Sequence, residues 1–157
     1  MPDSVATSGP YALRAEISNL YPPVAITDDS AVGFSNVVTD SSFFSPPPGK
    51  PSTRAALLFF EREPQTHVWS HVLTVPPPYL FDFRHVAMSK DICVVTLGPM
   101  VGVLNNLYDW KYTIYKKNAV SGVWQFLISY DQPNTVNMLG CSVNENGAIS
   151  LSIQGFT

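Results

Sequence analysis

Charged residues are scarce in this chain of 157 residues. Lys, Arg, Asp and Glu together make up 13% of it, about half of the roughly one quarter that is typical of soluble domains. The 9 basic residues are scattered among 12 acidic ones, and Lys116-Lys117 is the only basic pair. Nucleic-acid binding normally needs clustered Lys and Arg, so no nucleic-acid partner is expected. A 45% hydrophobic share also excludes the composition of a disordered chain.

Long apolar runs and targeting segments are also missing. No stretch approaches the roughly 18 apolar residues that a membrane-spanning helix needs, so no membrane span is expected. The N-terminus has no basic segment followed by an apolar one, which predicts that there is no secretory signal. The glycosylation pattern Asn-x-Ser/Thr occurs nowhere. These absences favour a cytoplasmic or virion-associated protein.

Cysteine is represented only by Cys93 and Cys141, too few for a disulfide framework. Each lies in an apolar run, and a buried free cysteine behaves as a small hydrophobic residue. Two structural thiols are therefore predicted, with a single bridge or a catalytic thiol as alternatives.

Short runs of β-branched and aromatic residues, separated by turn-forming residues, are abundant, and such runs predict strands. No segment shows the apolar spacing of an amphipathic helix, so the predicted class is all-β. Residues 1–53 are interpreted as an N-terminal arm with one β-hairpin and a Pro-rich linker at 39–53. Residues 54–157 are interpreted as one all-β domain. The expected strands are 24–26, 31–34, 55–60, 67–75, 84–88, 92–97, 111–115, 123–130, 140–143 and 148–153.

The all-β region repeats itself. Phe60-Glu61-Arg62 and Tyr115-Lys116-Lys117 lie 55 positions apart, and each stands nine residues before a tryptophan, Trp69 or Trp124. Similar hairpins occur at 24–33, 86–95 and 142–150. The region therefore divides into two four-stranded repeats, 54–104 and 105–157, and the N-terminal hairpin is half a repeat more. A four-stranded repeat of this length is typical of a propeller blade.

The order of these strands resembles the FG-GAP repeats of integrin-α-type propellers. Leu139-Gly140-Cys141-Ser142-Val143 stands where those repeats carry a Phe-Gly step before a Ser-Val strand, whereas the first repeat has Asp82-Phe83-Arg84-His85 there. The resemblance implies propeller-blade-like four-stranded antiparallel sheets. The acidic loop that holds calcium in that family is missing, so no calcium site and no other cofactor is implied.

Two and a half blades cannot close a ring, because propellers typically have four to eight. Either several chains complete one, which makes a homo-oligomer, or the sequence is a fragment. A compact β-sandwich or small β-barrel is the alternative fold.

Polar side chains offer few candidate sites. Asp82 and His85 are the candidate catalytic residues, since a histidine beside a carboxylate can act as a general base, although an ion pair that fixes the loop is the favoured interpretation. His67 and His71, beside Trp69, share one face of a strand, but no third metal ligand accompanies them, so no metal site is predicted.

Two further segments are candidates for binding. Pro76-Pro77-Pro78-Tyr79 matches the Pro-Pro-x-Tyr ligand of WW domains, which bind a polyproline helix, although a plain loop between two predicted strands is the favoured interpretation in a chain with 14 prolines. Tyr108, Asp109, Trp110 and Tyr112 crowd another segment, and aromatic faces beside polar groups suit carbohydrate. Trp110 and Tyr112 could instead be the inward face of a strand.

The predicted function is a non-catalytic binding or structural module for protein or glycan recognition and self-association, such as a lectin-like module or a viral surface or capsid projection. The alternative is a small β-barrel enzyme or ligand carrier that uses the His85 and Asp82 pair in a pocket. A large internal pocket around that pair would favour the alternative, and an open sheet edge would favour assembly.

Overall fold

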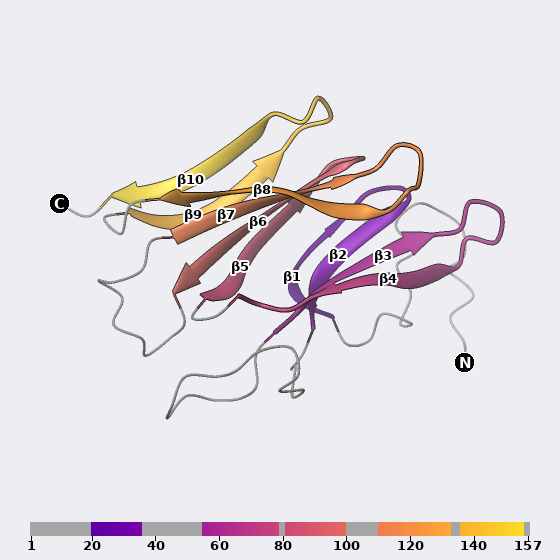
Figure 1. Ribbon diagram of the computed structural model, residues 1–157, viewed down its shortest axis with the longest axis horizontal. Coiled ribbons are helices and arrows are strands. Elements are labelled where there is room, and N and C mark those ends of the chain that lie inside the picture. The colour runs from indigo at the N-terminus through magenta and orange to yellow at the C-terminus, as the bar shows by residue number, and fades with distance from the viewer. Residues whose placement is uncertain (1–19, 36–54, 79–80, 100–109, 133–135, 156–157) are drawn as a thin grey trace.

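The computed structural model describes residues 20–35, 55–78, 81–99, 110–132 and 136–155, and every regular element within them is a β-strand (Figure 1). Each strand overlaps a segment that the sequence predicted as a strand, so the all-β class is confirmed, although β4 begins at Trp69 and leaves His67 in the preceding turn. The strands are β1 (Leu20–Ile26), β2 (Ser30–Ser35), β3 (Leu57–Arg62), β4 (Trp69–Val75), β5 (Phe81–Met88), β6 (Ile92–Pro99), β7 (Trp110–Lys117), β8 (Trp124–Gln132), β9 (Val136–Val143) and β10 (Ile149–Gly155).

The strands form three antiparallel sheets in simple up-and-down order. The first sheet is β1-β2-β3-β4, the second is β5-β6-β7-β8, and the third contains only β9 and β10. β5, the first strand of the second sheet, contacts both β1 and β9, the first strands of the other sheets. Four-stranded antiparallel sheets are thus confirmed, in an arrangement compatible with propeller-like blades or with a sandwich, and the described strands form no closed barrel.

The grouping of strands into sheets is shifted by half a repeat from the predicted repeats 54–104 and 105–157. The predicted repeats begin at β3 and β7, whereas the sheets begin at β1, β5 and β9. β2 pairs with β3 in the register Ser30↔Glu61 to Phe34↔Leu57, so the N-terminal hairpin opens the first sheet. The physical reason is that alternate residues of β2 and β3 contribute to one core. A long connection costs little closure entropy. The linker predicted at 39–53 lies outside the described residues.

The two four-stranded sheets are equivalent in detail. The β3–β4 turn contains His67 with φ of 58°, and the β7–β8 turn contains Gly122 with φ of 69°. The backbone N–H of each donates to the carbonyl four residues earlier, at Glu63 or Asn118, over 2.8 Å. His67 and Gly122 are 55 positions apart, so the offset seen in the sequence is also an offset in backbone conformation.

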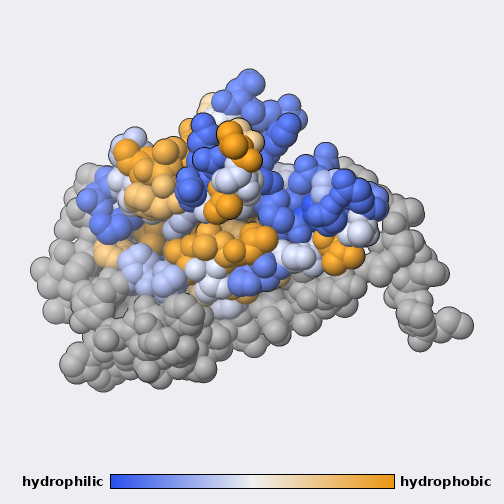
Figure 2. Space-filling view, turned by 45° about the vertical axis from the view of Figure 1, so that its right-hand side comes forward, coloured by the Kyte–Doolittle hydropathy of each residue, from blue (hydrophilic) through white to orange (hydrophobic). Residues whose placement is uncertain are grey.

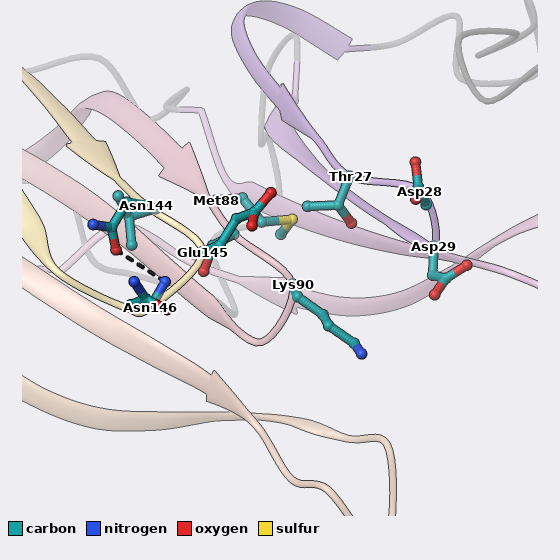
Figure 3. A pocket seen from close by; sticks show the side chains of 10 residues that line it. Thr27, Asp28, Asp29, Met88, Lys90, Asn144, Glu145 and Asn146 are labelled. Atoms are coloured by element: carbon teal, nitrogen blue, oxygen red, sulfur yellow. Dashed lines mark hydrogen bonds between the residues drawn. The ribbon is translucent and has the colours of Figure 1, made fainter.

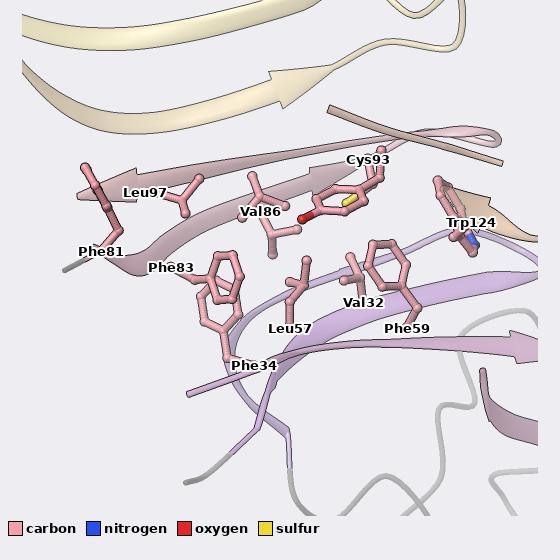
Figure 4. Close-up of a cluster of buried hydrophobic side chains, with 12 residues drawn as sticks. Val32, Phe34, Leu57, Phe59, Phe81, Phe83, Val86, Cys93, Leu97 and Trp124 are labelled. Carbon is pink, nitrogen blue, oxygen red and sulfur yellow. The ribbon is translucent and has the colours of Figure 1, made fainter. Parts of the chain in front are cut away.

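The main core lies between the first and second sheets. In Figure 4, side chains from β2 and β3 meet side chains from β5 and β6. The Phe34 and Phe83 rings stack with their centroids 6.1 Å apart. The buried members are Val32, Phe34, Leu57, Phe59, Phe81, Phe83, Val86, Cys93, Val95, Leu97, Tyr115 and Trp124.

The third sheet covers the opposite face of the second. Val94 and Thr96 of β6 are fully buried, and Met138 of β9 is 1% exposed. The Cys141 thiol lies 3.8 Å from the Val94 carbonyl oxygen. Both cysteines are free, and burial raises the pKa of the Cys141 thiol to about 11 and that of Cys93 well above its usual value. Two structural thiols are therefore present.

Candidate functional site

A polar network joins the first and second sheets at the edge of their core. The Glu61 carboxylate accepts hydrogen bonds from the Ser30 hydroxyl at 2.7 Å, the Lys117 ammonium at 2.6 Å and the Trp124 indole N–H at 2.5 Å. Glu61 and Lys117 keep only about a fifth of their side-chain surface exposed. β3 of one blade is thus tied to β7 and β8 of the next by charge as well as by apolar packing.

The Phe59 ring shows how the next blade covers this part of the first sheet. Its centroid lies 5.5 Å from the Tyr115 ring and 5.2 Å from the Trp124 ring, and Phe59 is fully buried. Burial raises the pKa of Tyr115 to about 12, and the Cys93 thiol adds to the effect. Tyr115 of β7 and Trp124 of β8 therefore cover β3 at Phe59.

The second sheet presents an equivalent surface on the face that points away from the first sheet. Register pairs Tyr112 with Tyr130 and Ile114 with Ile128, just as it pairs Leu57 with Val75 and Phe59 with Leu73 in the first sheet. Each residue lies 55 positions after its counterpart. The four residues of the second sheet, Tyr112, Ile114, Ile128 and Tyr130, are called the β7–β8 face below.

The β7–β8 face is much more exposed than its counterpart. Ile128 is 37% exposed and Tyr130 is 43% exposed, and Tyr112 and Ile114 are partly exposed, whereas Phe59 is completely buried. Hydrophobic side chains on the described surface gather in patches between hydrophilic ones, as Figure 2 shows for one side of the molecule. The corresponding surface of the first sheet is covered by the second sheet at Phe59. The exposed apolar β7–β8 face is therefore a candidate binding surface.

The tyrosines of this face are held against each other. The Tyr112 and Tyr130 rings stack with centroids 4.9 Å apart and an interplanar angle of 24°. Burial, and then the nearby Tyr130, raises the pKa of Tyr112. Tyr112 is therefore neutral at physiological pH, and the two stacked rings form one continuous aromatic surface on the sheet.

The sequence placed its aromatic candidate site partly on this face. Tyr112 belongs to it. Trp110 starts the same strand, and its ring lies against Gly98, where an added Cβ would come within 2.8 Å of it. Tyr108 and Asp109 lie outside the described residues.

The candidate catalytic residues lie on β5. The His85 ring nitrogen Nδ1 is 2.8 Å from the Thr96 hydroxyl, and the His85 backbone N–H donates to the same oxygen over 3.1 Å. Burial lowers the pKa of His85, and the positive charge of Arg84 lowers it further. Asp82 pairs with Gly98 across the ladder. Through both contacts with Thr96, His85 is tied to β6.

The histidines near Trp69 do not converge on a metal. Nδ1 of His67 lies 2.5 Å from the Arg62 guanidinium, and Nε2 of His71 lies 2.9 Å from the Thr74 hydroxyl. Within the described ranges there is no group of three or more His, Cys, Asp or Glu side chains that could hold a metal.

The Pro-Pro-x-Tyr segment follows β4. Pro77 is buried and Pro78 is exposed, whereas Tyr79 lies outside the described residues. A WW domain would have to reach a proline that the fold buries.

The residues that the structure describes include no helix with the length and hydropathy of a membrane span.

A second candidate site is an open pocket of about 840 Å³ where one turn from each sheet meets. Asp28 and Asp29 come from the β1–β2 turn, Lys90 from the β5–β6 turn and Glu145 from the β9–β10 turn (Figure 3). The Asn144 side chain caps its own turn, because its oxygen accepts from the backbone N–H groups of residues 146 and 148. Met88 and Val143 also line the pocket, so its lining is mixed polar and apolar.

Comparison with protein-family models, with curated proteins and with solved structures finds no match to this chain. The resemblance to FG-GAP repeats therefore stays a prediction.

Sequence reasoning missed Ile128, Tyr130 and Glu61. The signal was present, because the offset of 55 aligns β7–β8 with β3–β4 residue by residue. Finding the site required knowing which blade covers which, and only the packing of the sheets shows that.

Proposed function

We propose that this chain is a non-catalytic protein-binding module and that the β7–β8 face is its binding surface. One observation carries the proposal: Ile114 is partly exposed although Phe59, its counterpart in the repeat, is buried under two strands of the next blade. Fully burying an apolar side chain contributes about 1.5–3 kcal/mol. A partner that covers the face would gain this free energy at several positions.

The shape and chemistry of the face favour protein over glycan. Tyr112 and Tyr130 stack on each other, so part of their ring surface is already covered within the protein. Ile114 and Ile128 add aliphatic surface directly beside the two rings. Aromatic and aliphatic side chains with few charges are typical of the centre of a protein–protein interface.

The proposal is tested by site-specific photo-crosslinking in the cells that make the protein. A photoreactive phenylalanine analogue replaces Tyr130, and a matched control carries it at Val120, which is 97% exposed at the β7–β8 turn. We expect an adduct with another polypeptide from position 130 but not from position 120. Adding Ile114→Asp should remove that adduct.

Identical adducts from both positions, or none from either, would refute the proposal. An adduct that is lost on deglycosylation would assign the face to glycan instead. A mass of twice the chain would identify a second copy as the partner.

A further inference from the structure

In the part of the chain that the structure describes, the third sheet has two strands where the first two sheets have four. Among the described residues, β10 pairs with β9 alone, which leaves its other edge without a partner strand. β9–β10 buries Val94 and Thr96 of β6 completely but leaves Ile128 and Tyr130 exposed. If the third sheet had the same strand order as the first two, a third and a fourth strand added beside β10 would lie over β7–β8, as β7–β8 lies over β3.

The first interface shows what chemistry such strands would need. Two aromatic rings, Tyr115 and Trp124, cover Phe59, and the Lys117 cation neutralises Glu61. Counting 55 positions on from Phe59 and Glu61 gives Ile114 and Lys116 on the second sheet. Ile114 keeps the apolar character of Phe59, whereas Lys116 carries the opposite charge to Glu61.

Lys116 is exposed, and in the described part of the chain it makes no hydrogen bond or ion pair with another side chain. Strands that cover the face should therefore bring a carboxylate to it. Opposite charges placed across an interface favour the correct partner, and like charges reject the wrong one.

We propose that the partner of the β7–β8 face is a β-hairpin of another polypeptide, which completes the third blade. It adds its strands to the free edge of β10, lays an aromatic ring on Ile114 and sets a carboxylate against Lys116. This inference rests on the protein-binding function proposed above and specifies its mode, since pairing at a sheet edge is an established mode of peptide recognition.

A second copy stacked head to tail fits this chemistry poorly. Its β3–β4 hairpin carries Arg62 at the position that corresponds to Lys117, so the guanidinium would meet Lys116. Arg62 is moreover engaged with His67 of its own hairpin. The hairpin of a different chain, with an acidic residue at that position, is the better match.

The test uses the full chain and two synthetic probes. Both probes have the sequence of residues 110–132 with one cysteine added at each end, so that a disulfide closes the hairpin, because isolated hairpins are only marginally stable. One keeps Lys117, and the other carries Lys117→Glu. Binding is measured by fluorescence anisotropy, and hydrogen exchange follows the β10 amides.

We expect the Lys117→Glu probe to bind at least about tenfold more tightly than the Lys117 probe, the ratio that corresponds to about 1.4 kcal/mol. Lys116→Glu in the full chain should reverse this preference. Binding should slow the exchange of β10 amides. Tyr130→Ser, at a position that is 43% exposed, should weaken the binding of both probes, and a Trp124→Ser probe should not bind.

Equal affinities for the two probes, or a preference that Lys116→Glu does not reverse, would overturn the proposal. So would unchanged exchange in β10. If the probes fail while the crosslink at position 130 persists, the hairpin mode is wrong and the protein-binding function stands. If both fail, the face is not a binding surface.

Discussion

The contact between the first two sheets depends on Glu61, and replacing it tests how the blades are joined. Glu61→Ala removes the acceptor shared by Ser30, Lys117 and Trp124. A hydrogen bond to a charged group contributes about 1.5–3 kcal/mol, and an orphaned buried donor costs more than a lost exposed one. Lys117 stays about one fifth exposed, so water can recover part of its solvation. We expect the free energy of unfolding to fall by about 2–4 kcal/mol, out of the roughly 5–15 kcal/mol of a typical domain.

Urea denaturation followed by tryptophan fluorescence measures this loss. Glu63→Ala is the matched control, because Glu63 is an exposed carboxylate at the neighbouring turn and exposed substitutions usually change stability by less than about 0.5 kcal/mol. The double variant Glu61→Leu with Lys117→Met should recover only part of the lost stability, because it removes the unpaired Lys117 charge but leaves the Ser30 hydroxyl and the Trp124 indole N–H without their acceptor. If Glu61→Ala lost no more than Glu63→Ala, the network would not hold the blades together.

Two further predictions concern the second sheet. Gly98→Ala should lower the free energy of unfolding by about 1–3 kcal/mol, because its Cβ would lie 2.8 Å from the Trp110 ring; Gly140→Ala, whose Cβ meets nothing within 4 Å, is the control in the same denaturation assay, and equal losses would contradict the reasoning. The pKa of His85 is lowered by burial and then by Arg84, so the unfolded chain binds this proton more readily and stability should fall as the pH drops through about 6.5, the usual histidine pKa. An NMR titration of the His85 ring that gave a pKa at or above 6.5 would contradict this, and His85→Asn should flatten the pH dependence.

Local sequence patterns predicted the strands but not the grouping of the sheets. Alternation along β10, with Ile149, Leu151 and Ile153 on one side, is a property of neighbouring residues, and the strand forms where it was expected. That β2 pairs with β3 across more than 20 residues depends instead on the core that Phe34 and Phe59 share. Short-range sequence patterns do not show which distant strand becomes the partner.

The candidate sites show the same limit. The sequence identified Tyr112 as a surface aromatic but could not pair it with Tyr130, since the bulge between Ile114 and Tyr115 sets the register. Asp82 and His85 are close in sequence, yet the ring of His85 turns to Thr96 on the next strand. Proximity along the chain says little about which side chains meet in a pleated sheet.

The up-and-down order of the strands has a consequence for how this chain folds. Every strand pair in each sheet is formed by strands consecutive in the chain, so the contacts within a sheet are local compared with those of a Greek-key sandwich. Chains dominated by local contacts generally fold faster. Each sheet can therefore form from its own segment as the chain is synthesised, and docking of one sheet on the next is the step that joins distant parts of the sequence.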